Sequence, residues 1–250
     1  MADDGSLDDH RLAAAIASST GHLLLEVRAR LDGAPLDELR RAGDRRAHEH
    51  ILAELDRHRP DDAVLSEEGA DDDARLSAPR TWIVDPLDGT REYAEGRSDW
   101  AVHVALVEGG ELAAGAVALP GLGAILSTAS PPVVPPPSGG PVRLLVSRTR
   151  PPEVALAIGD ALGAELVPMG SAGAKAMAVV RGEGDVYAHA GGQYQWDSAA
   201  PVAVAVAAGL HASRMDGSPL RYNLAETWLP DVVVCRPELA ARVLEAAARA

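Results

Sequence analysis

Residues 82–90 read Trp-Ile-Val-Asp-Pro-Leu-Asp-Gly-Thr. The apolar start of this stretch predicts a β-strand, which we expect to end at Asp85 because Pro86 has no N–H to donate to a central ladder. Asp85 and Asp88 lie three residues apart, so both carboxylates and the Leu87 carbonyl can face one point. Such a point offers only oxygen ligands, which suit a hard cation such as Mg²⁺.

The same pattern is also common in ordinary turns, because Asp, Pro and Gly all favour them. Further acids occur at the ends of other predicted elements. The apolar run 63–65 predicts a strand that leads to Glu67 and Glu68. Asp44 and Asp197 stand where helical patterns begin, and both can be interpreted as helix N-caps.

Carboxylates gathered in a partly buried site raise one another's pKa, so such a cluster needs cations to stay ionised. Two metal ions held about 3.5–4 Å apart can activate a water and stabilise the leaving oxygen of a phosphate ester. If the acids converge, the sequence therefore indicates metal-dependent phosphoryl chemistry.

The pattern of apolar residues predicts helices first and α/β alternation later. Helices are expected over 10–31 and 44–58, and the apolar runs 100–107 and 112–119 predict a hairpin. Many prolines and glycines in 129–141 exclude a helix or central strand there, which suggests an N-terminal α+β half (1–140) and a C-terminal α/β half (141–250) that closes the active-site cleft. In the second half, strands are expected over 142–147, 165–169 and 231–236, and helices over 152–162, 172–181, 197–209 and 237–250.

Composition limits the possible function classes. The formal charge of −14 argues against binding to a nucleic acid polymer. Cys235 is the only cysteine, which excludes an intrachain disulfide and a thiolate zinc cluster and fits a reducing compartment. The acidic N-terminus does not resemble a signal peptide, and no apolar run has the length of a membrane span. We therefore expect a cytoplasmic protein without membrane contact.

Three blocks of the chain occur in the same order in one known family. They are Ser66-Glu67-Glu68, the stretch 82–90 and Trp196-Asp197-Ser198-Ala199-Ala200. Together with Gly170, Ser171 and Lys175 and the stretch 216–222, they resemble the inositol monophosphatase-like superfamily of lithium-sensitive, magnesium-dependent phosphatases. The resemblance implies an α/β (α+β) fold built as a layered α-β-α-β-α sandwich, a homodimer, two or three Mg²⁺ per site, and inhibition by Li⁺.

The resemblance also implies a role for each acid. Glu67, Asp85 and the Leu87 carbonyl would hold the first metal, whereas Asp85, Asp88 and Asp197 would hold the second. A third, more weakly bound metal would be held by Glu67, which we therefore count among the catalytic residues. Thr90, helped by Asp44, would orient the attacking water.

The residues after Thr90 favour one branch of the superfamily. Inositol phosphatases tend to continue Thr-Asn-Phe, whereas here Arg91-Glu92-Tyr93 follows, which is similar to CysQ-type 3′(2′),5′-bisphosphate nucleotidases. This implies hydrolysis of the 3′-phosphate of 3′-phosphoadenosine 5′-phosphate, or of its phosphosulfate analogue, to give AMP and phosphate in the first case, in sulfur assimilation. Candidate substrate contacts are Gly89, Thr90, Ser147, Arg148, Ser171, Lys175 and Gln195, with His189, Gly191 and Gly192 near the base or sugar.

Two alternatives stay open at this point. One is an inositol monophosphatase or fructose-1,6-bisphosphatase-like enzyme of broad specificity. The other is a non-catalytic metal-binding regulatory protein, although no EF-hand-like run of alternating ligands occurs. His103, on the apolar run 100–107, is interpreted as a core histidine without a role in the site.

Overall fold

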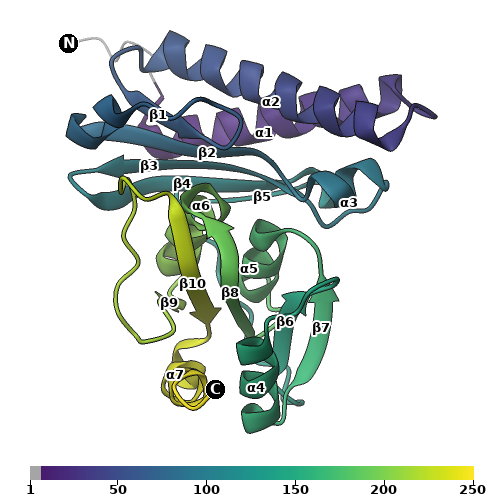
Figure 1. Ribbon diagram of the computed structural model, residues 1–250, viewed down its shortest axis with the longest axis vertical. Helices are drawn as coiled ribbons and strands as arrows, with labels where there is room; N and C mark the ends of the chain where they lie inside the picture. The colour runs from purple at the N-terminus through teal and green to yellow at the C-terminus, as the bar shows by residue number, and fades with distance from the viewer. Residues whose placement is uncertain (1–6) are drawn as a thin grey trace.

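A computed structural model describes residues 7–250, and it consists of five stacked layers (Figure 1). The outer layer contains α1 (Asp9–Arg30) and α2 (Leu36–His58). These helices cover one face of a sheet with the order β1-β2-β3-β4-β5, in which β1 and β2 are parallel and the other neighbours antiparallel. Its strands are β1 (Ala63–Ser66), β2 (Arg80–Asp88), β3 (Ala101–Glu108), β4 (Glu111–Leu119) and β5 (Ala124–Ser127).

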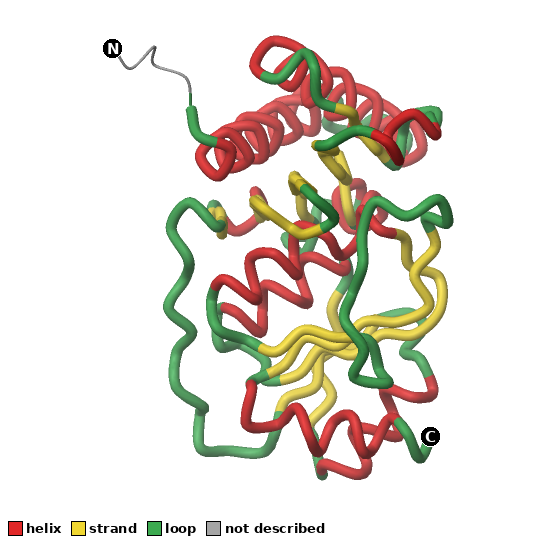
Figure 2. Tube along the Cα trace, turned by 90° about the vertical axis from the view of Figure 1, so that its left-hand side faces the viewer, coloured by secondary structure: helices red, strands yellow, loops and turns green. Residues whose placement is uncertain are grey.

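The second sheet has the order β7-β6-β8-β10-β9 and lies beyond a middle layer of two helices, α5 (Ala172–Val180) and α6 (Gln195–Ala207). Figure 2 shows the same succession of helices, sheet, helices, sheet and helices from the side. The last layer contains α4 (Glu153–Leu162) and α7 (Ala240–Ala247). The strands are β6 (Arg143–Ser147), β7 (Glu165–Met169), β8 (Val186–Tyr194), β9 (His211–Ser213) and β10 (Trp228–Cys235). The predicted α-β-α-β-α sandwich is therefore confirmed.

Three apolar cores hold the layers together. One lies between α1, α2 and the first sheet and includes Trp82 and Ile51. The largest lies around α5 and α6 between the two sheets, and the third lies between the second sheet and the α4 and α7 layer. Because the middle helices pack against both sheets, the interface between the layers is continuous. The division into halves at residue 140 stays a prediction.

The hairpin between β3 and β4 is confirmed, and its turn has a clear local cause. Gly109 and Gly110 both have positive φ angles, 59° and 87°, which is the geometry of the tight two-residue turns that suit the twist of antiparallel strands. The segment 131–140 contains no helix or strand, as its prolines predict.

Several predicted element boundaries were wrong. The second helix begins at Leu36, because Pro35 can stand at its N-cap and acidic residues occupy its first turn. Asp44 therefore lies inside this helix and does not cap it. The helix expected from Asp197 begins at Gln195, and β2 continues through an irregularity to Asp88.

Other differences concern the second half and the ends of the chain. The strands β5, β8 and β9 were not predicted, β10 begins earlier than expected, and the last segment starts with a 3₁₀ turn before α7. Part of the acidic N-terminus, residues 1–6, lies outside the described residues. Within residues 7–250, no helix combines the length and apolar character that crossing a membrane requires.

Candidate metal centre

The centre is built on the last residues of β2, where the ladder to β3 is interrupted. The register shifts between Asp85 and Asp88, so the chain bulges at the intervening Pro86. The backbone N–H of Leu87 donates to Asp85 Oδ1 at 3.0 Å, which fixes this carboxyl group. Gly89 then adopts a φ of 86°, which favours glycine, and α3 (Thr90–Ala94) begins.

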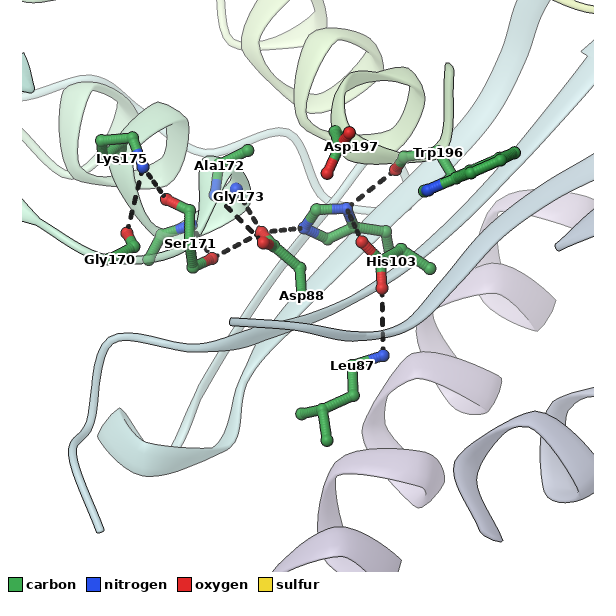
Figure 3. A network of polar contacts seen from close by, with 12 residues as sticks. Leu87, Asp88, His103, Gly170, Ser171, Ala172, Gly173, Lys175, Trp196 and Asp197 are labelled. Carbon is green, nitrogen blue, oxygen red and sulfur yellow. Dashed lines mark hydrogen bonds and ion pairs between the residues drawn. The ribbon is translucent and has the colours of Figure 1, made fainter. Parts of the chain in front are cut away.

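Asp88 is held by the N-terminus of α5 from the other half of the chain. Its carboxylate accepts hydrogen bonds from Ser171 Oγ at 2.5 Å, Ala172 N at 3.1 Å and Gly173 N at 2.6 Å (Figure 3). Burial opposes ionisation of Asp88, but His103, whose Nε2 lies 3.3 Å from Asp88 Oδ2, and the α5 donors lower its pKa to about 2. Asp88 is therefore a preorganised carboxylate.

Asp85 lies deeper and is only 1% exposed. Burial, followed by the charges of Glu67 and Asp88, raises its pKa well above the usual aspartate value. Ligand atoms of Asp85, Asp88 and His103 all lie within 4.8 Å of one another. The predicted convergence of the acids of β2 is therefore present in the fold.

Glu67 and Asp197 complete the acidic cluster from two other elements. Glu67 directly follows β1, and burial together with the charges of Asp88 and its acidic neighbours raises its pKa to about 7. Its side chain keeps contact with solvent, so water screens these charges more than at Asp85. Asp197 lies in the first turn of α6 and accepts from Tyr194 N at 2.6 Å, and burial with the charge of Asp88 raises its pKa to about 7.

Asp44 and Thr90 lie beside this cluster. Thr90 Oγ1 lies 3.1 Å from the carbonyl oxygen of Leu87 and 3.4 Å from Asp44 Oδ1, so its single proton can be donated to either acceptor. Burial and the charge of Glu68 raise the pKa of Asp44 to about 6. The pair predicted to orient water is therefore in hydrogen-bonding range.

The residues fit hard divalent cations. Carboxyl groups just after β1, on β2 and in the first turn of α6 interact with one another, and the pKa values of Glu67, Asp85 and Asp197 are raised by burial and by the charges of the neighbouring acids. A bound cation would remove this cost and would be held by oxygen ligands, which Mg²⁺ and Mn²⁺ prefer. The same donors do not form a thiolate or zinc-finger site.

A model of the inositol monophosphatase family matches residues 12–131 and 143–250. The chain belongs to the inositol monophosphatase family. Relatives within it include the "3′-phosphoadenosine 5′-phosphate phosphatase" of Mycobacterium leprae, 50% identical over 247 residues, which cover 94% of this chain and 91% of the relative. The "3′(2′),5′-bisphosphate nucleotidase CysQ" of Escherichia coli K12 is 31% identical over 216 residues, or 82% of this chain and 86% of the relative.

Solved structures of the inositol monophosphatase family share the fold. The crystal structure of CysQ from Bacteroides thetaiotaomicron superimposes with a TM-score of 0.73 at 27% identity, and the match covers 91% of this chain and 97% of that one. The inositol monophosphatase of Thermotoga maritima has a TM-score of 0.76 at 20% identity, with 97% and 98% coverage. The second likeness shows the fold alone.

His103 was not included in the metal centre by the sequence analysis. It is fully buried, its Nδ1 lies 3.0 Å from the Trp196 carbonyl, and it stands opposite Asp85 in the β2–β3 ladder. Because an antiparallel neighbour of a catalytic strand presents side chains to the same face, this cross-strand position was a usable signal.

Two of the predicted substrate contacts, Arg148 and Gln195, bond to other parts of the protein. Arg148 pairs with Glu92 at 3.2 Å and with Asp99, and Asp99 also accepts from Gly170 N at 2.6 Å. Gln195 is fully buried, and its amide bonds to the backbone of residues 224 and 226. These two side chains thus hold the fold together, and their contact with substrate stays a prediction.

The other candidates lie at the end of β6, at the start of α5 and before α3. Ser147 ends β6, and its Oγ accepts from Arg150 N at 3.3 Å. Ser171 bonds to Asp88, while Lys175 is buried beneath it. Gly89 faces Ser171, since a Cβ added to Gly89 would lie 3.1 Å from the Ser171 Cβ. Gly89, Ser171 and the metal centre are therefore contiguous, and their contact with substrate stays a prediction.

Proposed function

We propose that this chain is a magnesium-dependent phosphatase that removes the 3′-phosphate of 3′-phosphoadenosine 5′-phosphate, giving AMP and phosphate. Support for the substrate comes from the names of relatives that match most of the chain at 50% and 31% identity. Support for the chemistry comes from the acidic cluster. The proposal extends to the phosphosulfate analogue, a cytoplasmic location in sulfur assimilation, a homodimer and inhibition by Li⁺.

The convergence of Glu67, Asp85, Asp88 and Asp197 is the observation that carries the proposal. Glu67, Asp85 and the Leu87 carbonyl would hold one Mg²⁺, and Asp85, Asp88 and Asp197 another, with Glu67 available to a third. Bound Mg²⁺ supplies Lewis-acid polarisation of the phosphate and lowers the pKa of water.

The chain's own residues would prepare the attack on phosphorus. When the Thr90 hydroxyl donates to the Leu87 carbonyl or to Asp44, its lone pairs are free to accept a hydrogen bond from the attacking water. Asp44, with a pKa raised to about 6, is suited to accept a proton near neutral pH. The fixed Asp88 carboxylate keeps its position because the α5 donors hold it.

A cavity between β6, α4 and β8 offers room for a nucleoside. It measures about 560 Å³ and is lined by the segment from the end of β6 to the start of α4 and by the middle of β8, including Ser147, Arg150 and His189. Ser147 pairs in register with Met169, which leads directly to Gly170 and the start of α5. We propose that the base and sugar lie here while the 3′-phosphate reaches the acids.

Two residues of the sequence signature that favoured a nucleotidase, Glu92 and Tyr93, make contacts within the protein. Tyr93 is buried, its hydroxyl donates to the Leu24 carbonyl at 2.9 Å, and Glu92 pairs with Arg148. Glu92 and Tyr93 therefore do not supply substrate specificity by contact. This leaves the inositol monophosphatase or fructose-bisphosphatase alternative to be tested directly.

A substrate panel tests the proposal. Phosphate release from 3′-phosphoadenosine 5′-phosphate, inositol 1-phosphate and fructose 1,6-bisphosphate is compared as kcat/KM with Mg²⁺, and Asp88→Asn is the inactive control. The proposal expects the nucleotide to be preferred by at least about tenfold. A preference for inositol 1-phosphate would reject the substrate, whereas equal phosphate release by wild type and Asp88→Asn would reject the catalytic cluster and favour a binding protein.

A further inference from the structure

Lys175 is the only lysine in a chain that contains 22 arginines. It lies in α5 and is only 5% exposed, although lysine is among the side chains least often buried. Burial lowers the pKa of its ammonium group, and the charges of Asp88 and Glu92 oppose that shift. A solitary, buried lysine beside the metal centre requires a local explanation.

The ammonium group of Lys175 donates hydrogen bonds to the backbone just before α5. Nζ donates to the carbonyl oxygen of Ser171 at 2.5 Å and to that of Gly170 at 3.3 Å (Figure 3). It also lies 5.4 Å from the centre of the Tyr187 ring, a distance suited to a cation–π interaction. These contacts come from carbonyl groups and a buried aromatic ring, so the ammonium points into the protein.

The backbone that Lys175 holds is strained. Ser171 has a φ of 51° and a ψ of 134°, and Asn223 is the only other non-glycine residue with positive φ in the described part of the chain. Residues other than glycine rarely adopt this backbone conformation, so neighbouring contacts must stabilise it. Two hydrogen bonds from Lys175 to the carbonyls at and before Ser171 act directly on this strained unit.

The strained conformation aims three donors at Asp88. Ser171 Oγ accepts from Ala174 N at 2.9 Å and donates to Asp88 Oδ2, while the N–H groups of Ala172 and Gly173 donate to the same carboxylate. Rotation of the Ser171 backbone would turn these donors away from Asp88. Lys175 thus connects to Asp88 through Ser171, and a planar arginine fork would not reproduce its compact contact with two adjacent carbonyls.

We propose that Lys175 is a positioning residue that holds Ser171 in its strained conformation and so preorganises Asp88 to bind metal. This inference rests on the proposed metal centre. It assigns Lys175 a role different from the predicted contact with substrate phosphate. Groups that orient a metal ligand contribute strongly to metal affinity even when they do not touch the metal.

Metal binding without substrate gives the first test. Mn²⁺ affinity is measured by electron paramagnetic resonance for wild type, Lys175→Met and the exposed control Arg249→Met. We expect Lys175→Met to weaken Mn²⁺ binding by about 10- to 100-fold. At saturating Mn²⁺ its KM for 3′-phosphoadenosine 5′-phosphate should stay within about twofold of the wild-type value. Unchanged Mn²⁺ affinity with a raised KM would overturn the inference and identify a substrate contact.

A double-mutant cycle tests the route through Ser171. Glycine tolerates the positive φ, so in a Ser171→Gly background the lysine no longer has strain to oppose. Lys175→Met should then weaken Mn²⁺ binding by less than about threefold further. An equal loss in both backgrounds would show that Lys175 acts on Asp88 or the metal by another route, which contradicts the proposal.

A spectroscopic measurement keeps the inference testable should Lys175→Met not fold. Isotope-labelled lysine gives a single side-chain signal, because the chain has one lysine. We expect this signal to shift on addition of Mg²⁺ alone and to change little when nucleotide is added afterwards. A signal that ignores Mg²⁺ and responds to nucleotide would refute the positioning role. Absence of Mn²⁺ binding by the wild type would instead reject the proposed metal centre.

Discussion

The carboxylate of Asp197 should destabilise the metal-free protein as the pH rises. Burial and the charge of Asp88 raise its pKa from 3.8 to about 7, so near pH 5 the folded state keeps a proton that the unfolded chain has largely released. Stability is therefore unaffected below the pKa of the unfolded aspartate and is lost as the pH rises toward the folded value. At about 1.4 kcal/mol per pKa unit, a shift of about three units costs on the order of 4 kcal/mol above neutral pH.

Asp197→Asn removes this titration and keeps an oxygen acceptor for the Tyr194 N–H. Between about pH 5 and about pH 8, we expect the variant to gain about 2 to 3 kcal/mol of unfolding free energy relative to wild type. Chemical denaturation in the presence of a chelator measures the difference, and Asp160→Asn on the exposed face of α4 is the control. A pH-independent difference would refute the claim that burial and the charge of Asp88 raise the pKa of Asp197. Excess Mg²⁺ should reverse the order, because the wild type binds it more tightly.

Three further predictions concern the attacking water and the contacts between the halves. Thr90→Val should lower kcat by about a hundredfold while Thr90→Ser keeps most of it, as measured by phosphate release. Gly173→Ala should lower the unfolding free energy by about 1 to 3 kcal/mol, because the added methyl group overpacks the site. The methyl carbon added at Gly173 would lie 1.9 Å from His103 Nε2. The control Gly140→Ala, whose added methyl carbon has its nearest contact at 3.7 Å, should be neutral in the same denaturation series. Arg148→Met should cost about 1 to 3 kcal/mol, since two partly buried carboxylates lose their partner, and an unchanged midpoint of denaturation would contradict this.

The sequence patterns predicted some local elements because these are caused by neighbouring residues. The hairpin turn follows from two adjacent glycines, and the strand that carries Asp85 follows from an apolar run. The layered architecture was inferred from the family resemblance and confirmed by the fold. Boundaries were less predictable: Asp44 was placed at a helix start, but α2 begins at Leu36 and Asp44 lies inside it.

The support around the acids could not be predicted from local patterns. The donors to Asp88 lie 83 to 85 residues away in the chain, at the start of α5. His103 joins the site only because β3 pairs with β2 in a particular register. Arg148 seemed available for phosphate until the fold brought Glu92 and Asp99 to it. Such partners are determined by packing between segments far apart in the chain, which a single sequence does not display.

Crystals soaked in Mn²⁺ and measured for anomalous scattering would test the central claim most directly. The account predicts at least two Mn²⁺ peaks among Glu67, Asp85, Asp88 and Asp197, and loss of the peak beside Asp88 in the Asp88→Asn variant. Ordered crystals in which these four side chains hold no Mn²⁺, or in which the peaks lie elsewhere on the protein, would contradict it.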